Sequence, residues 1–323
     1  MSTSESPRSE ACARRGSSVA VAILNFRNFA DTIACIESVL RVDWPQLHVY
    51  VVDNASGNGS AEEIGTFLAG SESAQGRVSL FESPRNDGFA SGNNIAIRHA
   101  MDDGFDYVWV LNNDTIVEAD SVACFLRAAA RYQSSGRKVG PIGAKIVDYG
   151  REGAIQGVGG SYNVITGRVQ HVGGGQLDRG QFDDPALAEE LDYPLGVSMF
   201  VSRHFIEEVG LLSEDYFLYF EEIDWCRRAR RLGWSIGYCP DVRVMHKQGA
   251  SIGSNTDATL RSELSDVAGM KSRFTFIRKH HPWTLPFACA SLAVVVANRI
   301  RRGQGARIFA MLAAAWNGLR YVR

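Results

Sequence analysis

The chain has 323 residues, of which 45% are hydrophobic and 22% are charged. This length and composition allow one large globular domain or two ordinary ones, with a sizeable core. The formal net charge of −2 argues against a general nucleic-acid-binding protein. The six cysteines contain no CxxC pair, which argues against a zinc cluster or a disulfide framework and favours the reducing cytosol.

The first half of the chain alternates apolar runs with helical patterns. We expect buried strands at residues 19–24, 49–52, 78–81 and 107–111. Between them we expect helices at residues 31–40, 62–68 and 92–101. This alternation predicts an α/β fold with a mostly parallel, twisted, doubly wound sheet and helices on both faces.

The second half is less regular. Residues 140–180 are rich in glycine, and we expect β-hairpins and loops there. A strand is expected to end at His246, followed by helices at about 262–278 and 287–301 and by another apolar helix up to Trp316.

Polar residues follow the first strands of the predicted sheet. Asn25 and Asp53, the latter followed by Asn54, come directly after apolar runs. Because ligands of open α/β sheets bind at the carboxyl ends of the strands, these residues predict a ligand site. The Asp53 carboxylate can accept hydrogen bonds from a base or from ribose hydroxyls. The other interpretation is a plain turn, which Asp and Asn both favour.

A glycine-bearing loop at residues 86–94 (NDGFASGNN) leads into a predicted helix. Such a loop brings backbone N–H groups and a helix N-terminus toward a phosphate. The alternative is a flexible loop in which Ser91 or Asn93 caps the helix.

The segment 111–115 (LNNDT) is a candidate cation site. Asp114 and the amide oxygen of Asn112 offer two hard oxygen ligands on one face of a turn, and a bound divalent cation would neutralise a departing diphosphate. The alternative is another Asx turn after a strand.

Three acids, Glu221, Glu222 and Asp224, lie in the aromatic segment 216–226 (YFLYFEEIDWC). Burial beside apolar surface raises the pKa of a carboxyl group, which suits a general base near neutral pH. The acids also favour the N-terminus of a helix that continues through several arginines. We expect both interpretations to hold, with one acid directed into the cleft.

A histidine, His246, ends the strand predicted at 242–246 (VRVMH). A lone histidine is more often structural than a ligand, so this residue alone predicts little.

Taken together and in order, these motifs resemble the family 2 glycosyltransferases with the GT-A fold, most closely the bacterial rhamnosyltransferase branch. The resemblance extends from Val19 to Lys279. It is carried by five segments: residues 51–56 (VVDNAS), 86–94 (NDGFASGNN), 111–115 (LNNDT), 217–226 (FLYFEEIDWC) and 244–246 (VMH).

The resemblance implies a nucleotide-sugar pocket, a metal site and a base. The metal site, for Mg²⁺ or Mn²⁺, would comprise Asp114, Asn112 and His246. Adjacent helical residues point about 100° apart, so Glu221 and Glu222 cannot both face one acceptor. The resemblance implies Glu222 as the base, because it occupies the place of the acting carboxylate of the family, with Glu221 the alternative and Asp224 in support. The pocket residues implied are Asn25, Asp53, Asn54, Asn86, Gly88, Phe89, Asn93 and Asn112.

Two residues depart from the family pattern. The metal motif of the family often has Asp where Asn112 stands, which puts the metal affinity in doubt. Many members carry Asp where Glu222 stands, and the extra methylene changes reach but not chemistry.

The implied reaction is inverting, metal-dependent transfer of a sugar, L-rhamnose from dTDP-rhamnose or a hexose from a UDP-sugar, onto a hydroxyl of a cell-surface glycan or a lipid-linked precursor. A sugar nucleotidyltransferase would show a Gly-rich basic loop after the first strand, where residues 25–28 (NFRN) stand instead. A non-catalytic glycan-binding protein would not need Asp114 and the acidic cluster.

Three regions follow from these patterns. Residues 1–17 form a polar leader expected to be disordered, because no apolar signal sequence is present. Residues 18–260 form the catalytic domain, with a nucleotide-binding half at about 18–140 and an acceptor-side half at about 141–260. Residues 261–323 form a basic, apolar helical region.

The C-terminal region favours a membrane surface. It has no Asp or Glu from Val267 onward, and a basic segment attracts anionic lipids. The apolar run 285–297 is shorter than the roughly 20 residues of a spanning helix. We therefore expect a cytoplasmic protein bound peripherally to the inner face of the membrane, with a buried helix pair as the alternative. The oligomeric state stays open, a homo-oligomer included.

Overall fold

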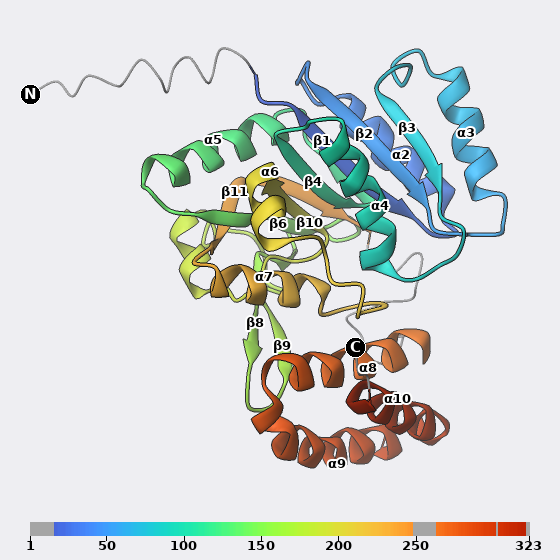
Figure 1. Cartoon of the computed structure of the whole chain (residues 1–323), viewed down its shortest axis with the longest axis vertical. Helices are drawn as coiled ribbons and strands as arrows, with labels where there is room; N and C mark the ends of the chain where they lie inside the picture. The colour runs from blue at the N-terminus through green and yellow to red at the C-terminus, as the bar shows by residue number, and fades with distance from the viewer. Residues whose placement is uncertain (1–15, 248–262, 302, 321–323) are drawn as a thin grey trace, which may run out of the picture.

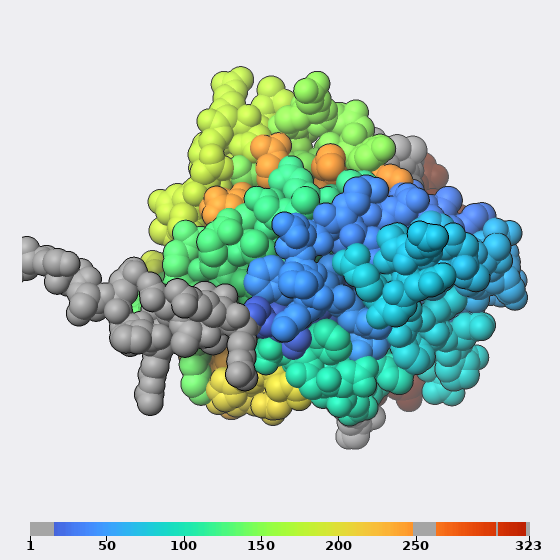
Figure 2. All heavy atoms as spheres, turned by 90° about the horizontal axis from the view of Figure 1, so that it is seen from above, coloured from blue at the N-terminus to red at the C-terminus, as the bar shows by residue number. Residues whose placement is uncertain are grey.

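The computed structural model describes residues 16–247, 263–301 and 303–320, so nearly all of the predicted leader lies outside the described residues. An α/β body and a unit of three helices lie at opposite ends of the long axis (Figure 1). When the molecule is seen from above, the body covers the helical unit, whose red shows only at the rim (Figure 2).

Nine strands of the described chain form one mixed sheet. Its order is β3-β2-β1-β4-β10-β6-β11-β5, and β7 pairs with β6. The four strands of the first half run parallel, as the sequence predicts. They are β1 (Val19–Asn25), β2 (Leu47–Asp53), β3 (Val78–Glu82) and β4 (Tyr107–Asn112).

Helices cover both faces of this sheet because its strands are apolar on both sides. In β1, Val21 and Ile23 pack in one core with α2 and α5, whereas Ala20 and Ala22 pack in the other with α4, α6 and α7. The helices are α2 (Phe29–Leu40), α3 (Ser60–Gly70), α4 (Phe89–Asp102), α5 (Ser121–Ser134), α6 (Arg203–Val209) and α7 (Glu221–Arg231).

The expectation of hairpins and loops from residue 140 onward is wrong for the first part of that stretch. Strand β6 (Val139–Asp148) lies inside the main sheet, parallel to β11 (Ser235–His246). Its small residues serve close packing, since a Cβ on Gly143 would lie 2.7 Å from the Pro194 side chain. The other elements of this half are β5 (Thr115–Val117), β7 (Ile155–Gly157), the hairpin of β8 (Gly159–Asn163) and β9 (Arg168–Val172), the 3-10 helix η1 (Pro185–Glu190) and β10 (Ser198–Ser202).

The helical unit has its own apolar core. Met270 and Phe274 of α8 pack against Met311 and Ala314 of α10 and Ala288 of α9. The hairpin of β8 and β9 extends from the body toward this unit (Figure 1). The elements, which confirm the predicted C-terminal helices, are α8 (Glu263–His280), η2 (Pro282–Thr284), α9 (Leu285–Arg301), η3 (Gly305–Arg307) and α10 (Ile308–Arg320).

A buried charge cluster around Asp224 fixes the helical unit to the body. The Asp224 carboxylate of α7 accepts hydrogen bonds from Arg228 Nε at 2.7 Å and Tyr216 Oη at 3.1 Å, and lies 2.6 Å from His280 Nε2 of α8. Lys279 Nζ lies 3.0 Å away. Burial alone would raise the pKa of Asp224, but the His280 hydrogen bond and the charges of Arg228 and Lys279 hold it well below its usual range. Asp224 therefore joins α7 to α8, and it also forms an i, i+4 ion pair with Arg228 along α7.

Candidate active site

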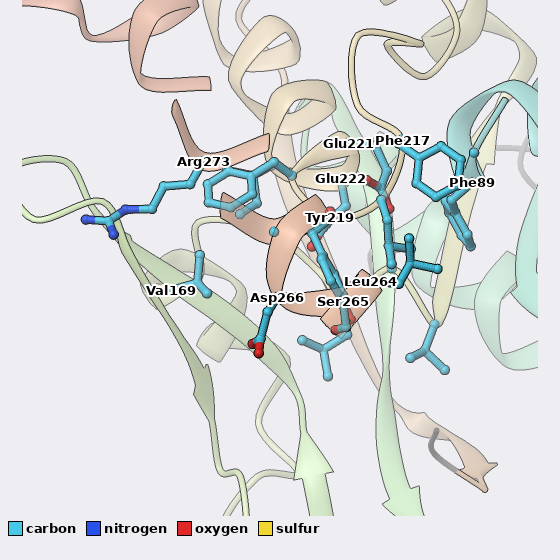
Figure 3. Close-up of a pocket in the computed structure, with 18 of the residues that line it drawn as sticks. Phe89, Val169, Phe217, Tyr219, Glu221, Glu222, Leu264, Ser265, Asp266 and Arg273 are labelled. Carbon is cyan, nitrogen blue, oxygen red and sulfur yellow. The ribbon is translucent and has the colours of Figure 1, made fainter. Parts of the chain in front are cut away.

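A cavity of about 550 Å³ lies between the α/β body and the helical unit. Polar loops that follow β2 and β4 line one part of it, the start of α7 lines the middle, and α8, α9 and α10 line the rest. Figure 3 shows Glu221 and Glu222 close to Phe89 and Phe217, with Ser265 and Asp266 of α8 on the same cavity.

Asn25 and Asp53 do not line the cavity, although the resemblance implies nucleotide contact. Both are buried behind its wall at neighbouring positions of β1 and β2. Asn25 Nδ2 donates to Asp53 Oδ1 at 2.6 Å, and Thr32 Oγ1 donates to Asn25 Oδ1 at 2.7 Å. The Ser56 amide donates to Asp53 Oδ2 at 2.9 Å. These bonds shape the turn that carries Asn54.

Five of the expected nucleotide-side residues do line the cavity: Asn54, Asn86, Gly88, Phe89 and Asn112. Asn54 Nδ2 donates to Asn86 Oδ1 at 2.9 Å, which joins the two loops, and Asn54 Oδ1 has no partner in the described part of the chain. Asn93, the remaining expected residue, is buried in α4 and donates to the Phe89 carbonyl at 3.0 Å, outside the cavity lining.

Gly88 permits a close contact between the loop at residues 86–94 and the acidic segment at residues 216–226. Its φ is +101°, and a Cβ at this position would lie 2.2 Å from the Phe217 carbonyl oxygen. The Phe89 amide donates to that same oxygen at 2.8 Å. Any larger residue at position 88 would push apart the loop before α4 and the loop before α7.

The expected metal ligands come together through strand pairing. His246 of β11 is the register partner of Thr115 of β5, so it lies beside Asp114. His246 Nε2 and Asp114 Oδ1 are 3.1 Å apart, and both side chains are buried. Asn112 Oδ1 is buried without a hydrogen-bond partner in the described chain. An imidazole nitrogen, a carboxylate and an unpaired amide oxygen fit a divalent cation such as Mg²⁺ or Mn²⁺.

Gln156 of β7 orients His246, and no sequence signal pointed to it. Gln156 Nε2 donates to the His246 carbonyl at 2.9 Å, so its Oε1 is left to accept from His246 Nδ1 at 2.7 Å. The proton is then on Nδ1, and the Nε2 lone pair faces Asp114. Two electron-rich atoms 3.1 Å apart repel unless a cation or a proton lies between them. This arrangement resembles the outer partners of metal-bound histidines.

The described chain has no group of three or more His, Cys, Asp or Glu residues suited to a metal. The candidate set therefore depends on Asn112 and on ligands from a bound substrate. The cysteines of the described segments, Cys35, Cys124, Cys226, Cys239 and Cys289, are free.

Both Glu221 and Glu222 line the cavity, so the expectation that only one of them faces it is wrong. They occupy the first two positions of α7, whose N-terminal end points at the cavity, and both side chains reach the cavity despite the 100° step. The chain enters the helix through Tyr219 and Phe220, with φ values of +67° and +73°. Such left-handed non-glycine residues cluster at functional sites.

The environment of the two acids makes them candidates for a base. Burial raises the pKa of Glu222 to about 7, although backbone amides at Glu222, Ile223 and Phe220 lower it in part. Burial and the nearby charge of Glu222 raise the pKa of Glu221 well above its usual range. Oε2 of each carboxylate has no partner in the described chain. Asp224 lies outside the cavity lining, within its charge cluster.

The sequence matches the protein family described as glycosyltransferase like family 2, over residues 16–263. The chain belongs to this family. A hexosyltransferase of low-salt glycan biosynthesis, Agl10 of Haloferax volcanii, is 29% identical over 178 residues, 53% of this chain and 52% of that protein. N-acetylglucosaminyl-diphospho-decaprenol L-rhamnosyltransferase of Mycobacterium tuberculosis is 26% identical over 56% of this chain and 58% of its own length. The chain thus spans little more than half the length of these relatives.

Solved structures share the fold. The mannosyltransferase PcManGT from Pyrobaculum calidifontis, in complex with GDP-Man and Mn²⁺, has a TM-score of 0.54 and 15% identity, over 97% of this chain and 93% of its own. GalNAc-T7 with UDP, GalNAc and Mn²⁺ has a TM-score of 0.58 and 15% identity, over 81% of this chain and 48% of its own. The fold is therefore the GT-A α/β fold, as the sequence resemblance implies.

Proposed function

We propose that this glycosyltransferase transfers a sugar from a nucleoside diphosphate donor to an acceptor hydroxyl with inversion at the anomeric carbon. The observation that carries the proposal is the shared cavity: Glu221 and Glu222, with raised pKa values, line the same space as Asp114 and His246. A carboxylate with a pKa near neutrality can take the hydroxyl proton as the acceptor oxygen attacks. A single displacement of this kind inverts the sugar.

The polar loops suit the donor. Asn54 and Asn112 each present a buried, unpaired amide oxygen, and the loop at Asn86 and Gly88 offers backbone groups near the start of α4. Asp114, His246 and Asn112 would hold the cation, which when bound supplies charge neutralisation for the departing diphosphate. The carbonyl of Asp114 is held by the Lys247 amide at 2.9 Å, which fixes the turn.

For the donor we propose dTDP-L-rhamnose, and for the acceptor a hydroxyl of a cell-surface glycan or lipid-linked precursor. Support comes from the names of relatives: the mycobacterial L-rhamnosyltransferase, and dTDP-rhamnosyl transferase RfbF of Shigella flexneri, 20% identical over 64% of each chain. A UDP-hexose donor is the second candidate, because the Haloferax relative is a hexosyltransferase.

We propose that the helical unit binds the inner face of the membrane. The span from Pro282 to Arg301 has 20 residues, and 17% of its most apolar stretch is buried. By length and composition it is long and apolar enough to cross a membrane, whereas the sequence predicts a shorter apolar run. Yet Leu285, Leu292 and Val295 of α9 pack against the core of the unit. This packing favours a helix that lies on the surface of the bilayer.

The first prediction concerns the base. Glu222→Gln keeps size but removes basicity, so transfer should fall by roughly 10²–10⁴-fold while nucleotide binding survives. Wild-type transfer should rise with pH through about 7, because the raised pKa of Glu222 keeps the acid protonated below that value. Release of the nucleoside diphosphate, as the sugar is transferred to an acceptor or to water, measures both effects.

Glu221→Gln is the matched control for Glu222→Gln. Normal transfer by Glu222→Gln together with loss in Glu221→Gln would move the role to Glu221. Normal transfer by both variants would refute a base at this position.

The second prediction concerns the cation. Gln156→Leu should weaken Mn²⁺ binding by about 10–100-fold, because His246 loses the acceptor that fixes its tautomer. Gln156→Glu retains an acceptor for Nδ1 and should bind Mn²⁺ more tightly than Gln156→Leu. Calorimetric titration of Mn²⁺ in the presence of nucleoside diphosphate measures the affinity. Equal Mn²⁺ affinity in the wild type and Gln156→Leu would contradict the role of Gln156 in orienting His246.

The third prediction concerns the membrane. Phe309 and Trp316 of α10 are 83% and 58% exposed, and a double change of both to Ser should reduce flotation with anionic vesicles. Leu232→Ser, a change of a 46% exposed residue on the body, is the control and should float as the wild type does. High salt should weaken binding, and alkaline carbonate should release the protein. Failure of the wild type to float at low salt, or retention in carbonate, would contradict peripheral attachment.

A further inference from the structure

The cavity continues past the carboxylates into the helical unit. There Met270 of α8, Val295 of α9 and Met311 of α10 line it, together with Leu264 at the start of α8. Glycan hydroxyls need hydrogen-bond partners, whereas methionine and valine side chains suit a flexible hydrocarbon. This part of the cavity is therefore unsuited to the sugar of either substrate.

The polar groups at this end carry excess positive charge. Asp266 is buried and already paired with two arginines, Arg299 at 2.7 Å and Arg307 at 3.1 Å. One carboxylate thus faces two guanidinium groups. No acidic residue follows Asp266 in the sequence.

Two further arginines line the cavity where the hairpin meets α8. Arg273 of α8 donates to the Thr166 carbonyl and to Ser291 Oγ, and neither Arg273 nor Arg168 of β9 forms an ion pair with a carboxylate in the described segments. In Figure 3, Arg273 extends toward the hairpin that carries Val169. Burial and the charge of Arg168 lower the pKa of Arg273, so the two cations lie close enough to repel. A phosphate group would relieve this repulsion and accept a hydrogen bond from Arg273 Nε, which has no partner in the described chain.

The outer surface of the same helices is apolar and open to solvent. Phe287 and Val294 of α9 are 55% and 62% exposed, and they belong to the helical unit that we propose binds the membrane. A lipid could therefore reach the cavity from the bilayer without its chain crossing water.

We propose that the space between α8, α9 and α10 binds the hydrocarbon chain of a lipid diphosphate, and that Arg168 and Arg273 hold its diphosphate. The acceptor sugar carried by such a lipid would then lie beside Glu221 and Glu222. This last step rests on the proposed function, whereas lipid binding itself does not.

The test is calorimetric titration with farnesyl diphosphate below its micelle concentration, with farnesol and inorganic diphosphate as separate probes. Divalent cations are left out, so that the diphosphate is not captured beside Asp114 and His246. Farnesyl diphosphate should bind more tightly than either fragment. Met311→Trp fills the apolar end and should weaken its binding by about tenfold or more. Leu312→Trp, the same change at the neighbouring exposed residue of α10, should leave it unaltered.

Arg168→Gln distinguishes binding of the lipid diphosphate group from binding of its hydrocarbon chain. This residue is exposed, and its loss should weaken binding of farnesyl diphosphate but not of farnesol. If Met311→Trp fails the check of folding by circular dichroism, Val295→Phe takes its place. The same farnesyl diphosphate affinity in the wild type and the cavity-filling variant, or an affinity no better than that of inorganic diphosphate, would overturn the proposal. Binding of farnesyl diphosphate, together with failure of a nucleoside diphosphate to bind in a separate titration that contains Mn²⁺, would instead overturn the donor assignment and leave the lipid site standing.

Discussion

Two carboxylates in an apolar cavity are the constraint on which the rest of this structure depends. An ionised acid without a partner costs several kcal/mol to bury, so Glu221 and Glu222 remain in place only because the surrounding fold holds them there. The N-terminal end of α7 favours negative charge at these positions. The left-handed Tyr219 and Phe220 direct the chain so that this helix end faces the cavity. The same burial that destabilises the charges gives the acids pKa values suited to proton transfer.

Contacts on either side keep the start of α7 fixed. The Asp224 cluster joins α7 to His280 of α8, so the helical unit is linked to the helix that carries the acids. On the other side, the Phe217 carbonyl accepts a hydrogen bond from the Phe89 amide, which joins the acidic segment to the loop before α4. The sheet therefore positions the donor side, the helical unit forms the opposite wall, and α7 lies between them.

Much of the fold follows from local sequence patterns. Alternating apolar runs predict β1 to β4 and their helices because these strands are buried on both faces and end in turn residues. Strand β6 escapes prediction, since its glycine and proline residues resemble a loop until Pro194 is known to pack against Gly143. The C-terminal helices are predictable as helices, but nothing in their sequence shows that Val295 and Met311 face a cavity.

The site is predictable in its chemistry and less so in its geometry. The motifs identify Asp114, His246, Glu221 and Glu222, and the register between β5 and β11 then brings the first two together. No local pattern distinguishes a polar residue on the cavity from one behind its wall, and Asn25 and Asp53 are of the second kind. Gln156 lies 90 residues before His246 in the chain, so only the tertiary structure reveals their contact.

The most direct measurement is a pH titration of the glutamate carboxyl carbons by ¹³C NMR, in the wild type and in Glu221→Gln and Glu222→Gln. Because the two acids interact, the pair should show two apparent pKa values rather than one for each residue. We predict resonances that disappear in the variants and titrate with apparent pKa values well above the ordinary range, one of them near 7, because the side chains are buried. If every glutamate of the wild type titrates near the ordinary value of about 4.3, the carboxylates are not held in an apolar cavity and the account is contradicted.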